Sequence, residues 1–213
     1  VADFRGKNGT FFVLHTVPGL QFAARTMDTT FLLPRPQLVH GSFFTDASWI
    51  VRGRSGDRSF LVRAAASSIG FDVYDAKSPT NLTLLGSQHS PWRSWSLDGV
   101  EVSVKHSTMF VRAHGWRMEC TRKPIYNHVS GPSKWRFDVS IKLEGHIGRC
   151  YPHGLLGQSW DGDEVGIDGN TDDYTFREEE PIIVTKAQAE GAIEGEYSHY
   201  AISNDRSTSF WYS

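Results

Sequence analysis

Strict alternation of apolar and polar residues is the feature that most limits what this chain can fold into. It is clearest over residues 135–144, where every second residue is apolar. The apolar set is Trp135, Phe137, Val139, Ile141 and Leu143, and the polar set is Arg136, Asp138, Ser140, Lys142 and Glu144. Because successive side chains of a strand point to opposite faces, this segment predicts a strand with one face in a core and the other in water.

The same period of two runs through most of the chain, broken by turn residues. Pro18-Gly19, Asp98-Gly99 and His114-Gly115 each stand between two alternating runs and predict hairpin turns. Residues 37–44 and 47–52 predict two further strands with a break between them. About fourteen short strands of this kind predict an all-β fold, an antiparallel β-sandwich or rolled sheet.

One short helix is expected near the C-terminus. Residues 185–193 are rich in alanine and begin with Thr185, a residue that caps helices well. The aromatic tail that follows is expected to add a last strand or to form an exposed end. We therefore expect one β domain over residues 1–213, with an acidic loop over 150–180 and a helix plus tail over 185–213.

Composition excludes two classes of function. The chain has 213 residues, of which 39% are hydrophobic, and a formal net charge of −2. No apolar run approaches the roughly 18–20 residues that a membrane-spanning helix needs, so we expect no membrane span. The charge balance leaves no basic footprint for nucleic acid.

Several features agree with export from the cell. The chain opens on Val1 rather than methionine, as a processed precursor would, and it carries two glycosylation sequons, at Asn8 and Asn81. The two cysteines, Cys120 and Cys150, would stabilise the fold by roughly 3–4 kcal/mol if they formed a disulfide. Two free buried thiols are the alternative. We expect a secreted protein.

The most unusual stretch is an acidic one between Asp161 and Glu180. Nine carboxylates stand there against the single cation Arg177: Asp161, Asp163, Glu164, Asp168, Asp172, Asp173, Glu178, Glu179 and Glu180. Such crowding is self-repulsive unless a cation or solvent relieves it. Calcium takes about six to eight oxygen ligands in a tolerant geometry. The residues that offer them are Asp161, Asp163, Asn170, Asp172 and Asp173.

The same stretch has two other interpretations. An EF-hand is rejected, because Val165 falls where the loop needs an oxygen ligand and Asp172 stands where it needs glutamate. A solvated acidic hairpin that turns at Asp168-Gly169 remains open beside the calcium loop.

Two segments of the chain resemble the von Willebrand factor type D module, and similar modules of inter-alpha-trypsin inhibitor heavy chains and plant root cap proteins. The first, residues 3–14 leading to 22–25, is similar to the family's opening hairpin. The second, residues 145–163 with 170–173 downstream, contains His-Gly-Leu-Leu-Gly-Gln and is similar to the family's metal-binding segment. The chain has two cysteines where the family has many, so the resemblance does not imply disulfide-linked multimers. It also lacks the Gly-Asp-Pro-His cleavage motif.

The resemblance implies a calcium-binding β domain. The calcium ligands that it implies are Asp161, Asp172 and Asp173, then Gln158 and Asn170, and more remotely Asp3. Asp163 is added on chemical grounds alone.

Enzymatic chemistry is not expected. His146, Cys150 and His153 are close in sequence but lack a fourth ligand for structural zinc, and Ser159 lies in a Gly-x-Ser-x-Asp stretch that lacks the final glycine of a nucleophile elbow. Neighbouring acids in one loop seldom span the cleft that a glycosidase needs.

We therefore expect a secreted, non-enzymatic structural or adhesive domain. A calcium-stiffened loop would fix one end of it, and it would assemble with copies of itself, as a homo-oligomer, or with matrix partners. The alternative is a calcium-dependent carbohydrate-binding module. In that case Trp92 and Trp95, which flank a polar loop, would form the platform on which glycans stack.

Overall fold

The computed structural model of the chain describes residues 7–33, 38–78, 81–89, 93–146, 151–160, 182–184 and 200–202. Over these ranges the chain is all-β and mostly antiparallel, which confirms the predicted class. The expected helix at 185–193 and the aromatic end of the tail lie outside them. No helix in the described ranges has the length and apolar character needed to cross a bilayer.

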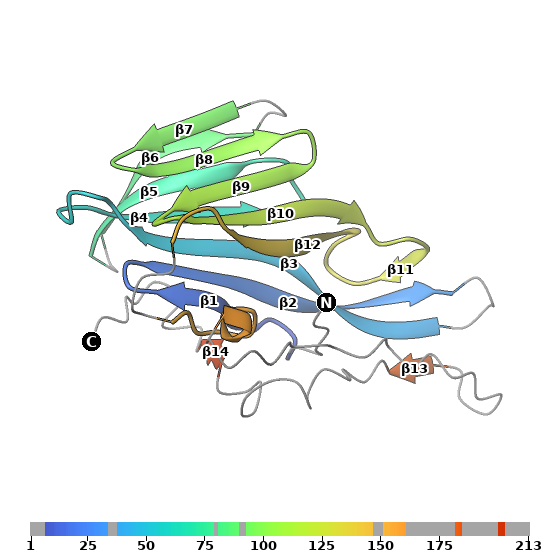
Figure 1. Ribbon diagram of the computed structural model, residues 1–213. Coiled ribbons are helices and arrows are strands. Elements are labelled where there is room, and N and C mark those ends of the chain that lie inside the picture. Colours follow the sequence, from blue (N-terminus) through green and yellow to red (C-terminus); the bar gives the residue numbers. More distant parts are fainter. Residues whose placement is uncertain are drawn as a thin grey trace.

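Nine strands form the larger sheet, with the order β14-β1-β2-β3-β4-β5-β6 and with β11 paired to β2 and β13 paired in parallel to β3 (Figure 1). The strands are β1 (Phe11–Val17), β2 (Leu20–Leu32), β3 (Leu38–Arg52), β4 (Ser59–Ala65), β5 (Phe71–Ser78), β6 (Asn81–Gln88), β11 (His128–Ser130), β13 (Ile182–Val184) and β14 (Ala201–Ile202).

Five strands form the smaller sheet, with the order β12-β10-β9-β8-β7. They are β7 (Arg93–Leu97), β8 (Val100–Lys105), β9 (Thr108–Ala113), β10 (Trp116–Pro124) and β12 (Trp135–Leu143). The strands from β7 to β10 follow one another as a meander, the green and yellow strands of Figure 1. A single 3-10 turn, η1 (Gly157–Trp160), follows later in the chain.

The two sheets share one hydrophobic core. In the larger sheet Phe22 and Trp49 stack with their ring centroids 4.8 Å apart, and both are fully buried. The smaller sheet contributes Trp116 and Met118 to the same cluster. Strand β12 behaves as its alternation predicts, because its apolar residues either are buried or pack against this core. Burial between the sheets is therefore what holds the two layers together.

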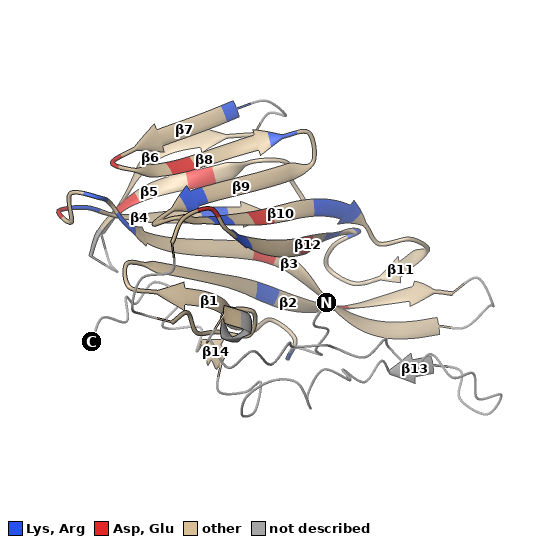
Figure 2. Cartoon of the chain, viewed as in Figure 1, with Lys and Arg blue, Asp and Glu red and all other residues tan. Residues whose placement is uncertain are grey.

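The outer face of the smaller sheet carries opposite charges on neighbouring strands (Figure 2). Lys142 of β12 pairs with Glu119 of β10 at 2.9 Å, and Arg112 of β9 pairs with Glu101 of β8 at 3.1 Å. Ion pairs with at least one exposed partner contribute at most about 1 kcal/mol each, so these pairs add little to the stability of the fold.

The predicted hairpin turns are present. Asp98-Gly99 joins β7 to β8 with φ values of 50° and 79°, and His114-Gly115 joins β9 to β10 with 51° and 80°. Positive φ at both central residues gives the turn a twist that matches the flanking strands.

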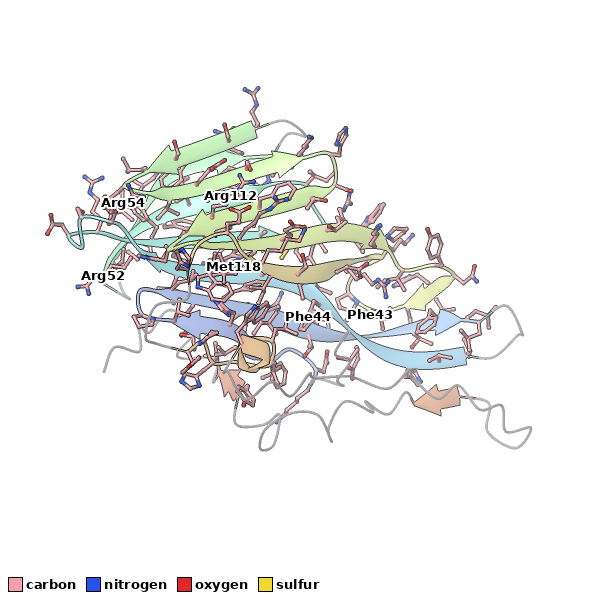
Figure 3. The ribbon with its side chains drawn as sticks, in the orientation of Figure 1. Phe43, Phe44, Arg52, Arg54, Arg112 and Met118 are labelled. Atoms are coloured by element: carbon pink, nitrogen blue, oxygen red, sulfur yellow. The ribbon has the colours of Figure 1, made fainter. Side chains whose placement is uncertain are left out.

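The tip of the β7–β8 hairpin also contacts the other sheet. Asp98 accepts hydrogen bonds from the backbone N–H of Ser55 at 3.0 Å and from its hydroxyl at 2.7 Å. Arg54, which lies with Arg52 at the left end of Figure 3, donates its backbone N–H to the carbonyl of Asp98. These bonds join the β3–β4 turn to the β7–β8 turn, so the two sheets are fastened at this end.

The break predicted at Thr45-Asp46 is wrong. Strand β3 runs through it as 15 continuous residues, and the register shifts between Arg25 and Thr26 of β2. Thr45 is the extra residue of a β-bulge, and its hydroxyl donates to Asp46, which in turn pairs with Arg25 at 2.8 Å. A partner 21 residues away in sequence thus allows the strand to continue, and a local pattern does not contain that information.

Candidate functional site

The candidate site is built on residues 151–160, which we call the docking segment. It lies along β1 and is held there by backbone hydrogen bonds. Thr16 and His153 exchange N–H···O bonds of 2.8 and 2.9 Å, and the N–H groups of Leu155 and Leu156 donate to the carbonyls of Val13 and Leu14. The docking segment therefore extends the sheet beyond β1, next to the place where β14 pairs.

Two glycines permit this close approach. Gly154 has a φ of +105°, and a Cβ atom on it would lie 2.7–2.8 Å from backbone atoms of Leu14 and His15. At Gly157 a Cβ atom would lie 3.3 Å from Nδ1 of His15. Leu155, between them, is buried in the shared core. Glycine and leucine are thus required here for packing.

His15 lies directly beneath the docking segment. It is 0% exposed, and its ring centroid is 4.3 Å from that of Trp116 in β10 and 6.3 Å from that of Trp160 in η1. Neither ring nitrogen has a hydrogen-bond partner among the described residues. Burial disfavours the charged imidazolium and lowers the pKa of His15 from 6.5 to about 4. His15 is not among the residues predicted from sequence. The signal that could have identified it is the presence of a histidine among the apolar residues of β1.

The docking segment ends where the acidic stretch begins. Trp160 contacts Trp116 edge to face, with centroids 5.4 Å apart, so the docking segment is held on the core up to its last residue. Of the predicted calcium ligands, Gln158 has its backbone in η1. The others lie outside the described residues: Asp3, Asp161, Asp163, Asn170, Asp172 and Asp173. Within the part of the chain that the structure describes, no three His, Cys, Asp or Glu side chains are grouped as metal ligands.

Cys120 disagrees with the predicted disulfide. It is a free thiol, completely buried between the sheets, and burial raises its pKa well above the ordinary value. Cys150 lies outside the described residues. The state of Cys120 agrees with the alternative prediction of a buried free thiol, which behaves as a small hydrophobic residue.

The prediction of a glycan platform fails at Trp95. Its ring packs edge to face on Phe60, with centroids 5.4 Å apart, and also covers Gly86. It belongs to the rim of the core, while Ser94 and Ser96 on either side are exposed. The period of two along β7 turns the tryptophan inward, and this alternation was the signal that could have placed it. Trp92 lies outside the described residues.

One sequon begins in the turn before β1, and the other begins at the first residue of β6. Asn8 is exposed in the turn before β1, and its side-chain oxygen accepts a hydrogen bond from the backbone N–H of Asp28 at 2.9 Å. Asn81 is the first residue of β6, and Thr83 of the same sequon is exposed. Glycosylation at either position stays a prediction.

No family model, curated protein or solved structure matches this chain. The class that the described residues define is a two-sheet, all-β domain with a segment docked along one sheet edge.

Proposed function

We propose that this chain is a secreted, non-enzymatic β-sandwich domain of the von Willebrand type D-like kind, with a structural or adhesive role. Its acidic stretch binds calcium, and the bound ion neutralises the carboxylates so that the loop becomes a rigid surface. The proposed ligands are Asp161, Asp163, Asp172 and Asp173, with Asn170, Gln158 and Asp3.

One observation carries this proposal. The docking segment is fixed by four backbone hydrogen bonds, by burial of Leu155 and by the contact of Trp160 with Trp116. It leads directly into 20 residues, from 161 to 180, that hold nine carboxylates and one arginine. A loop that starts from a rigid point loses less conformational entropy when it binds an ion, which favours a built site over a solvated hairpin.

Calcium is the ion of choice because the donors are carboxylate and amide oxygens. When bound, the ion supplies positive charge that cancels the mutual repulsion of these groups. The docking segment positions the start of the loop. Leu155, which is buried, and Trp160, which is partly buried, hold that segment on the core.

The carbohydrate-binding alternative is weaker. Trp95 packs inward on Phe60, which removes half of the expected platform and leaves Trp92 alone. We therefore favour the structural role, with self-assembly or matrix partners.

A calorimetric melt tests the proposal. At free calcium a few hundred to a thousand times Kd, binding contributes roughly 3–4 kcal/mol, and for a chain of this size about 1 kcal/mol shifts Tm by roughly 2–4 °C. We expect Tm to fall by about 10 °C when calcium is chelated. The double variant Asp161→Asn, Asp172→Asn should lose this difference, whereas Asp57→Asn, in the exposed β3–β4 turn, should keep it. Identical melts of the wild type with calcium and with chelator would leave the solvated hairpin as the explanation.

A further inference from the structure

Strand β6 forms one edge of the larger sheet. Its eight residues, Asn81–Gln88, pair with β5 on one side, and no described strand pairs with the other side (Figure 1). Leu82 packs with Tyr74 against the small cluster formed by Ile50, Leu61 and Ala76, so the strand is anchored to the sheet. In an antiparallel pair every second residue directs its N–H and C=O groups away from the partner, so β6 offers a row of backbone groups to another strand.

The sequence of this edge lacks the charges that usually protect one. Asn-Leu-Thr-Leu-Leu-Gly-Ser-Gln contains no lysine, arginine, aspartate or glutamate and no proline. The two edges of the smaller sheet differ in this respect, because β7 begins with Arg93 and β12 carries alternating charges (Figure 2). Charged residues and proline on an edge normally oppose pairing with a second chain.

Two leucines are exposed at the centre of β6. Leu84 is 53% exposed and Leu85 is 36% exposed, which makes Leu84 the most exposed leucine among the described residues. A bulge lies at Leu85, because Val73 pairs with Gly86 and Tyr74 pairs with Leu84. A second shift in register lies between Ala76 and Ser78 of β5, near the start of β6. The bulge at Leu85 places both leucines at the middle of the strand, where a partner strand would contact them.

We propose that β6 is a self-association surface, through which two copies of this chain pair antiparallel about a two-fold axis. A second copy fits this edge for a specific reason. Two copies of β6 can pair in any register without repulsion between like charges, because the strand carries no charge. A partner strand that carries charge would find no opposite charge on β6. The complementary partner is an uncharged strand with apolar residues at its centre, and β6 itself is such a strand.

This proposal names the surface for the self-assembly that the proposed function includes, and it rests on that part of the proposed function. The calcium loop is not involved in the pairing. The two ideas therefore fail separately. A wild type that forms no dimers would contradict pairing through β6. A wild type whose melting temperature is unchanged by chelator would contradict the calcium loop.

Sedimentation velocity of the full chain, produced without glycans, is the first test. We expect a monomer–dimer equilibrium that persists in chelator and that Leu84→Lys weakens at least tenfold. Val129→Lys is the matched control, because Val129 is 55% exposed but lies on β11, which pairs with β2. A monomeric wild type at high concentration, or equal weakening by both variants, would overturn the proposal.

Cross-linking provides a second test that does not depend on weakening the dimer. Single cysteines are introduced at successive positions of β6 in a Cys150→Ser background, in which Cys120 stays buried. Antiparallel two-fold pairing brings only residues near the axis next to their own copies. We expect oxidation to cross-link one or two adjacent positions and the yield to fall on both sides. A flat yield along β6 would contradict strand pairing.

Discussion

Replacing His15 with phenylalanine is expected to prevent a large part of the loss of stability that occurs as the pH falls from 6.5 to about 4. The reason is the position of the ring. It is fully buried under the docking segment, and neither nitrogen has a partner among the described residues. The side chains recorded around it, Phe22 across on β2, Trp116 on β10 and Trp160 on η1, carry no charge that could stabilise an imidazolium.

The magnitude follows from the difference between the two states. In the unfolded chain the pKa of histidine is 6.5, and burial lowers the pKa of His15 in the fold to about 4. Above pH 6.5 both states are neutral and the full stability is present. As the pH falls below 6.5 the unfolded chain takes up a proton that the folded chain excludes, and each pH unit costs about 1.4 kcal/mol. The loss reaches about 3 kcal/mol near pH 4, where the folded ring also begins to protonate.

Urea unfolding at pH 7, 6, 5 and 4 measures this dependence. The wild type should lose about 3 kcal/mol from this group over the window, and His15→Phe should be flatter by that amount. At pH 7 the variant should be as stable as the wild type or more so, because two unpaired nitrogens are replaced by carbon. His146→Gln, at an exposed histidine, is the control and should keep the wild-type slope. Equal slopes for His15→Phe and the wild type would refute the reasoning.

Three further predictions concern other parts of the chain. Gly154→Ala is expected to cost about 2–4 kcal/mol in urea melts, since its methyl group would meet the backbone of β1, whereas Gly56→Ala, also at positive φ but in open space, should cost about 1–2 kcal/mol. Equal losses would show that the contact with β1 is loose. The hydrogen bonds from Ser55 lower the pKa of Asp98, so the stability contributed by this carboxylate is present above its ordinary pKa and is lost as the pH falls through the lowered one. Ser55→Ala should raise the pKa of Asp98 in an NMR titration, and an unchanged pKa would remove Ser55 as the cause. A glycan at Asn81, the first residue of β6, should abolish dimers in sedimentation experiments, and dimers of the fully glycosylated chain would argue against pairing at this edge.

The features that sequence predicted well are those with local causes. Alternation over residues 135–144 places the inward side chains of β12, because the period of two belongs to the strand itself. Asp98-Gly99 specifies a hairpin because both residues tolerate positive φ. The calcium ligands stay a prediction, since all but the backbone of Gln158 lie outside the described residues.

The features that sequence did not predict depend on partners far along the chain. Strand β3 continues past Thr45 because Asp46 is paired with Arg25 on the neighbouring strand. Cys120 is buried because it faces the shared core from β10, which lies between β9 and β12 at the centre of the smaller sheet. No window of sequence contains these relations, because they arise only when strands are assigned to sheets.

The docking segment shows how the two kinds of information combine. His-Gly-Leu-Leu-Gly belongs to the segment that resembles a metal-binding segment. In the structure, however, its residues pack on the fold: Gly154 lies against β1, and Leu155 is buried in the core. Variants at these positions are therefore expected to act on the loop indirectly, by loosening the point from which it starts. The acids from Asp161 onward are expected to act directly on the ion. A variant of the first kind should lower stability with and without calcium, and one of the second kind should remove only the difference between the two conditions. This contrast separates anchoring from ligation within one continuous stretch of chain.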